Sequence, residues 1–126
     1  MKVKDIENII LEVYPSISKD YKSNAKVELF SNIFSRLNAI PADEEDSMAE
    51  YCWEDNVIFI YSDTIETEED VIRALIHECV HSKQSCELHE AYYEIGLDYN
   101  THPHEIEAEY EEEKWKKYKL NTITCG

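Results

Sequence analysis

The sequence predicts an α+β fold, in which a few helices pack around a small β-sheet. The chain has 126 residues, which is the length of one domain with one hydrophobic core, so a single domain over residues 1–126 is expected. The apolar fraction is 43%, as in globular proteins, whereas 2 glycines and 3 prolines are too few for a sandwich or barrel with many tight turns. Apolar residues recur mainly at helical spacing, and one segment is rich in aromatic and β-branched residues.

Two helices are expected in the first third of the chain. The apolar residues of 6–13 recur at helical spacing, and Pro15 is expected to end that helix. The same spacing recurs over 27–37, where the second helix ends before Pro41. The run PADEEDS that follows predicts an acidic surface loop.

A β-hairpin and a further helix are expected next. The polar residues 54–56 separate two segments rich in aromatic and β-branched side chains, which is typical of a hairpin, and 57–61 is its second strand. Thr67 is followed by three acidic residues, which favour the positive N-terminal end of a helix. The sequence therefore predicts that a helix begins at Thr67 and continues through 71–84.

The last third of the chain is expected to contain a short helical piece, an irregular loop around Gly96 and a final helix. Pro103 suits the first turn of that final helix, which is predicted to run to about Lys119. No repeat or linker divides the chain, which agrees with one domain.

The charge of the chain excludes some classes of partner. With 28 acidic and 12 basic residues the net charge is −16, and such a surface repels phosphate backbones and anionic lipids. Neither nucleic acid nor a membrane is therefore expected as a partner. Charged residues interrupt the apolar residues of 1–15, so no signal peptide is expected, and the four cysteines form no C-x-x-C pair. A reducing, cytoplasmic location is expected.

The segment VIRALIHECVHSKQ, residues 71–84, contains the pattern H-E-x-x-H as His77, Glu78 and His81. Residues four apart lie on one stripe of a helix, so both imidazoles project together, opposite the apolar face. Imidazoles on consecutive turns can bind one zinc ion. Glu78 is rotated about 100° from His77, which places it beside the ion as a general base. The alternative is a solvated helix face with two histidines at this spacing by chance.

A third ligand would separate these two interpretations, and the residues alone leave several candidates. Three histidines elsewhere in the chain are candidates: His89, His102 and His104. The acidic final helix offers Glu105 or Glu107, which differ by about 200° around the helix, so only one of them can face a given metal ion. Glu107 is followed one turn later by Glu111 and Glu105 by Glu109, so periodicity does not choose between them.

A known family contains this combination of motifs. An H-E-x-x-H helix after a β-hairpin, followed by a Glu-Ala step in a later helix, resembles the gluzincin type of zinc metallopeptidase. The likeness covers roughly residues 51–115 and is nearest to the minimal members called minigluzincins and to the ImmA/IrrE-like peptidases. It implies a zincin-like minimal domain in which the glutamate before the alanine is the third ligand, here Glu107. An acidic residue four positions on, here Glu111, would support a histidine ligand. Glu109 stands where the ImmA/IrrE branch often has asparagine.

The resemblance implies a zinc-dependent endopeptidase that acts on a peptide or protein substrate. Zinc bound by His77, His81 and Glu107 would activate a water molecule, and Glu78 would deprotonate it for attack on the peptide carbonyl. The strand 57–61 is expected to offer an exposed edge to an extended substrate. A second donor would stabilise the oxyanion, and five residues are candidates: Tyr92, Tyr93, Tyr99, His89 and His102. The alternative function is a non-catalytic binding or regulatory protein that contains a metal and holds a partner on the same scaffold.

Overall fold

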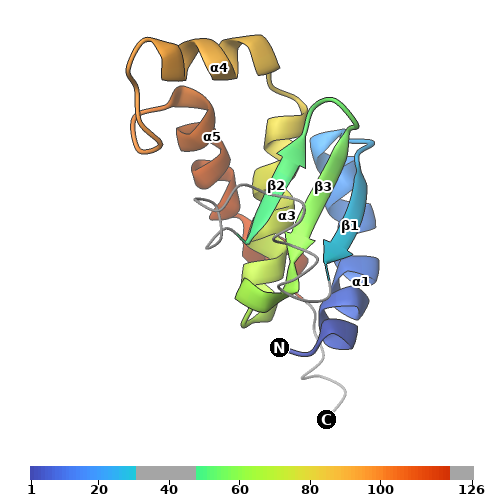
Figure 1. Ribbon diagram of the computed structural model, residues 1–126. Helices are drawn as coiled ribbons and strands as arrows, with labels where there is room; N and C mark the ends of the chain where they lie inside the picture. The colour runs from blue at the N-terminus through green and yellow to red at the C-terminus, as the bar shows by residue number, and fades with distance from the viewer. Residues whose placement is uncertain (31–47, 120–126) are drawn as a thin grey trace.

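The computed structural model describes residues 1–30 and 48–119, and it confirms the α+β class (Figure 1). Within these ranges the chain forms four α-helices and one three-stranded sheet. The elements are α1 (Val3–Tyr21), β1 (Lys26–Phe30), β2 (Ala49–Cys52), β3 (Val57–Tyr61), the 3-10 turn η2 (Ser62–Thr64), α3 (Glu68–Ser82), α4 (Cys86–Glu94), α5 (Pro103–Glu112) and the 3-10 turn η3 (Trp115–Tyr118). None of the helices in the described part of the chain combines the length and the apolar content needed to cross a bilayer.

The sheet is mixed, with the strand order β1-β3-β2. The expected hairpin is present: β2 pairs antiparallel with β3, so that Cys52 lies opposite Val57. The turn residue Asn56 has a φ of 56°, the left-handed region that asparagine tolerates better than most residues. β1 pairs parallel with the other edge of β3. The expectation that 57–61 offers an exposed edge is therefore wrong, because β3 is the central strand.

The helix expected over 27–37 is wrong at its start, since Lys26–Phe30 is strand β1. Val27 and Leu29, two positions apart, both pack against the core, as alternate residues of a half-buried strand do. The segment is a strand rather than a helix because each of its residues pairs with a residue of β3. The remainder of the expected helix lies outside the described residues.

Pro15 does not end α1, which continues to Tyr21. Proline removes the hydrogen bond to the carbonyl four residues earlier, that of Leu11, whose side chain is 67% exposed. The lost bond therefore lies on the solvent side, where water can replace it. The buried stripe continues to Ile17 at 0% exposure, and this packing stabilises the extra turns.

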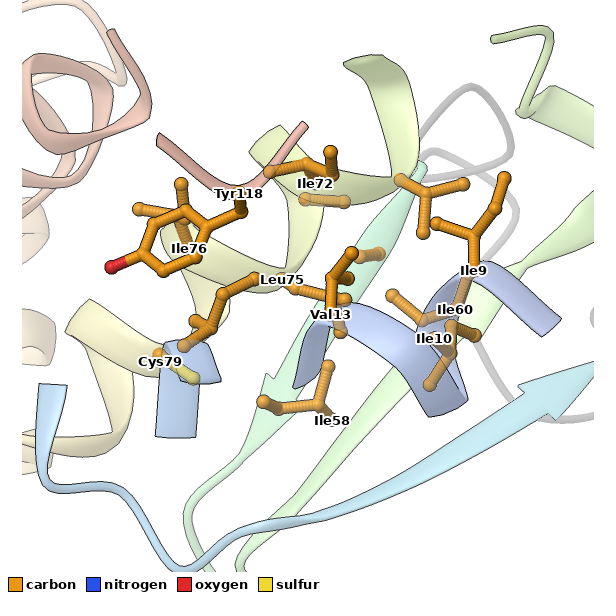
Figure 2. Close-up of a cluster of buried hydrophobic side chains, with 14 of the residues drawn as sticks. Ile9, Ile10, Val13, Ile58, Ile60, Ile72, Leu75, Ile76, Cys79 and Tyr118 are labelled. Atoms are coloured by element: carbon orange, nitrogen blue, oxygen red, sulfur yellow. The ribbon is translucent and has the colours of Figure 1, made fainter. Parts of the chain in front are cut away.

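The helix α3 is the centre of the fold. Its start is the predicted one, a capping box in which Thr67 Oγ1 accepts from the Asp70 N–H at 3.1 Å and Asp70 Oδ2 accepts from the Thr67 N–H at 3.1 Å. Its apolar face packs against α1 and the sheet (Figure 2). Figure 2 shows this core with Ile9, Ile10, Val13, Ile58, Ile60, Ile72, Leu75, Ile76, Cys79 and Tyr118 labelled.

The opposite face of α3 is covered as well. α5 packs along it, and β2 also contacts α3. The histidines and the glutamate of the H-E-x-x-H pattern are consequently buried, although they face away from the apolar core. In contrast α4, which has no buried residue, lies across one end of α3 and α5 (Figure 1).

Candidate metal centre

The two histidines of α3 and one glutamate of α5 meet in the interior of the protein. The Nε2 atom of His77 lies 3.0 Å from Oε1 of Glu105, and the Nε2 atom of His81 lies 2.8 Å from the same oxygen. The three side chains are buried. One ligand atom from each lies within 4.8 Å of the other two, which is close enough for one metal ion to bind all three.

The orientation of His77 is set by Glu112, also on α5. The Nδ1 atom of His77 lies 2.6 Å from Oε2 of Glu112. An ionised carboxylate only accepts hydrogen bonds, so Nδ1 donates its proton to Glu112. The guanidinium of Arg73 lies 3.9 Å from the other Glu112 oxygen. The lone pair of Nε2 therefore faces Glu105.

The orientation of His81 is set by Gln84. The Nδ1 atom of His81 lies 2.6 Å from Oε1 of Gln84. The amide nitrogen of Gln84 donates to Oε1 of Glu107 at 2.7 Å and to the carbonyl oxygen of His104 at 3.0 Å. Both of these partners are acceptors, so the amide has only one satisfactory orientation, with its oxygen toward His81. Nδ1 donates to that oxygen, and the Nε2 lone pair again faces the centre.

Two imidazole lone pairs and a carboxylate oxygen thus point at one place, which demands a positive charge. Burial alone would lower the pKa of both histidines, but hydrogen bonds to carboxylates raise the pKa of His77 to about 10 and that of His81 above its ordinary value. Burial alone would raise the pKa of Glu105, but its bonds to the two histidines lower it. Without a metal the cluster holds protons. A divalent cation meets the same demand with greater charge, and this donor set fits zinc.

Glu78 lies beside this centre in a cavity of about 730 Å³. Its side chain is buried but reaches the cavity wall, as do those of His77, His81 and Glu105. Burial raises the pKa of Glu78, the two histidines oppose the shift, and the carboxylates of Glu105 and Glu50 add to it. A carboxylate with a raised pKa is a stronger base, which suits proton transfer at neutral pH.

The structure does not bring Glu107, the expected third ligand, to the two histidines. The Glu107 side chain is exposed and accepts a hydrogen bond from Gln84. Ala108 is 0% exposed and, with Glu105 and Glu112 at three positions before and four after, lies on the side of α5 that packs on α3. Glu107 is rotated about 200° from Glu105 and cannot share that side. Glu105 takes the place expected for Glu107.

Glu111 does not support a histidine ligand either. It accepts a hydrogen bond from the Tyr21 hydroxyl at 3.0 Å, and this bond joins α5 to α1. It also pairs with Lys114. Glu112, one residue later, holds His77 instead. A signal for Glu112 existed in the sequence, because Glu105, Ala108 and Glu112 have the spacing of one helix face with a small residue in the middle. No comparable pattern singles out Gln84.

Three of the five candidate oxyanion donors line the cavity: His89, Tyr93 and Tyr99. The Tyr93 hydroxyl lies 3.4 Å from the second oxygen of Glu105, so its ring is already directed at the centre. His102 is not a candidate in this geometry, since Nε2 donates to the carbonyl oxygen of His89 and Nδ1 accepts from the His104 N–H. Tyr92 does not line the cavity described here.

Comparison of the chain with protein-family models, with curated proteins and with solved structures found no match.

Replacing Gln84 with alanine is expected to weaken zinc binding by roughly 10–100-fold, because His81 would lose the acceptor that keeps its proton on Nδ1. Competition with a chelating dye measures the change, and circular dichroism checks the fold. Lys83→Ala changes the adjacent residue but keeps its backbone N–H, which caps α3 at the carbonyl oxygens of Val80 and His81, and should leave the affinity unchanged. Equal affinity in Gln84→Ala and the unaltered protein would contradict the role of this amide.

Proposed function

We propose that this chain is a zinc-dependent peptide hydrolase of the gluzincin kind. One observation supports this most directly: the Nε2 atoms of His77 and His81 and an oxygen of Glu105 converge beside a cavity that Glu78 also lines. The centre therefore combines three metal ligands with an uncoordinated base, and the cavity gives a substrate access to both.

Each residue of the site would have a separate role in hydrolysis. Zinc held by His77, His81 and Glu105 would supply Lewis acidity at the cavity. Glu78 would accept a proton from the attacking water and pass it to the amine that leaves. Glu112 and Gln84 keep both imidazoles in the tautomer that presents Nε2. Tyr93 lies where it can donate a hydrogen bond to the oxyanion.

The walls of the cavity support a peptide as substrate. Its volume, about 730 Å³, is within the range of small-molecule sites and accommodates a short stretch of chain. One wall is formed by β2 and the residue Trp53, and another by the aromatic rings of Tyr93 and Tyr99. Aromatic side chains give large contact areas to the side chains of a peptide. β2, rather than the central strand β3, is the strand beside the substrate.

Removal of the metal tests the proposal. The purified protein should contain about one zinc ion per chain, and 1,10-phenanthroline should remove both the zinc and the cleavage of a mixed peptide library. Added zinc should restore cleavage, which mass spectrometry of the products measures. A protein that binds no divalent metal would contradict the proposal. Tight zinc binding without cleavage of any library would support the non-catalytic alternative instead.

A further inference from the structure

All five histidines of the chain lie in one continuous row of ring contacts. The rings of His77 and His81 are 4.7 Å apart between centroids, and that of His81 is 5.4 Å from that of His89. His89 is in turn 4.3 Å from His102 and 5.7 Å from His104. The candidate metal centre uses only the first two, so the three at the other end need a separate explanation.

His102 is explained by the fold. Its side chain is 0% exposed and caps α5, since Nδ1 accepts from the His104 N–H at 3.1 Å. Nε2 donates to the carbonyl oxygen of His89 at 2.8 Å, which joins α5 to α4. Both ring nitrogens are therefore engaged.

His89 and His104 are not explained in this way. Among the residues that the structure describes, the Nδ1 atoms of these two side chains are buried and have no hydrogen-bond partner. A buried polar atom without a partner costs about 1–3 kcal/mol, so each such atom points to something that satisfies it. One ring nitrogen from each of His89, His104 and His102 lies within 4.8 Å of the others. Histidine side chains grouped in this way, two of which have an Nδ1 atom without a partner, are a donor set for a transition metal ion.

We propose that Nδ1 of His89 and Nδ1 of His104 bind a second transition metal ion of the zinc class. His102 keeps its capping bond, so the protein supplies two ligands. The second ion is therefore expected to bind more weakly than the ion at the three-ligand centre. This site stands independently of the proposed hydrolase activity.

The second ion would fasten α4 to α5. No residue of α4 is buried, and among the described residues it meets other elements mainly through ring contacts of its aromatic side chains, through the His89 carbonyl bonded to His102 and through the Tyr93 hydroxyl bonded to Glu105. An ion bound by both His89 and His104 would link α4 and α5 where apolar packing is thin. Tyr93 and His89, which line the cavity, are both on α4, so the second ion would also order that wall. This last effect rests on the proposed function.

Metal titration of the intact chain tests the second site. Calorimetry with zinc and absorption spectra with cobalt(II) should show about two equivalents in the unaltered protein, one tight and one weaker. His89→Gln and His104→Gln should each weaken the second equivalent by roughly tenfold or more and leave the first in place. Hydrogen exchange of the α4 amides should slow only when the second equivalent binds. Glu87→Gln, an exposed residue on the same helix, is the matched control and should change neither equivalent.

The His77→Ala variant separates this proposal from that of the catalytic centre. It should lose the tight equivalent and keep the weaker one, with circular dichroism confirming the fold. A single equivalent in the unaltered protein, or a second one that survives both His89→Gln and His104→Gln, would overturn the second site. Loss of the second site with the tight equivalent intact leaves the proposed function standing. A tight equivalent that His77→Ala does not remove would count against the proposed centre alone.

Discussion

Glu78→Gln is expected to leave zinc bound and to reduce peptide hydrolysis by roughly 10²–10⁴-fold, the usual contribution of a general base. Glutamine preserves the volume of the side chain but cannot accept the proton of the attacking water. Glu78 is not part of the group of ligand atoms formed by His77, His81 and Glu105, so the affinity for the metal should change little. Rate measurements at saturating zinc, together with the metal content, separate the two properties.

The same variant should also fold more stably in its metal-free form. Burial raises the pKa of Glu78, which means that the folded protein disfavours its ionised form at neutral pH. An uncharged glutamine removes that cost, as is common when a buried catalytic group is replaced. Glu90→Gln removes a carboxylate from the surface of α4 and is the control for both measurements. Hydrolysis at the full rate in Glu78→Gln would exclude the proposed mechanism.

Glu105→Ala is expected to weaken zinc binding by more than roughly 100-fold, since it removes a direct ligand rather than a residue that supports one. Two neighbouring glutamates of α5 provide the comparison. Glu107→Ala should cause a smaller loss, because Gln84 would keep the carbonyl oxygen of His104 as an acceptor. Glu109→Ala, at an exposed position of the same helix, should cause none.

The affinities of these three variants can be measured against a competing chelator. Thermal unfolding with and without zinc shows whether each variant still folds and whether the metal still stabilises it. Glu105→Gln, which retains the shape of the side chain, is the second variant if alanine impairs folding. The opposite order, with Glu107→Ala losing zinc and Glu105→Ala keeping it, would mean that the other face of α5 meets α3.

The local parts of the fold and of the site could be predicted from the sequence. The pattern around Thr67 predicts a helix start because a capping box is formed by residues three apart. The projection of His77 and His81 to one side follows from helical geometry alone. The hairpin turn over 54–56 is equally local. Each of these depends on neighbours in the chain, which the sequence displays directly.

What the sequence could not show depends on partners that are distant in the chain. Lys26–Phe30 is a strand because β3, about thirty residues away, offers it an edge. Whether Glu105 or Glu107 meets the histidines depends on which side of α5 packs on α3. The resemblance implied Glu107, but in this structure Glu105 is the glutamate beside His77 and His81. Gln84 matters only because His104 and Glu107 come to lie beside it.

The three candidate ligands and the two residues that orient the histidines belong to α3, to the turn that follows it, or to α5. An ion there would join two helices that also meet through Ala108 and through the hydrogen bonds of His77 and Gln84 to α5. Part of the binding free energy would then stabilise the position of α5. In a cell short of zinc, α5 would detach more often, and the chain would be open to degradation at that end. The supply of the ion would thus govern the lifetime of the protein as well as its chemistry.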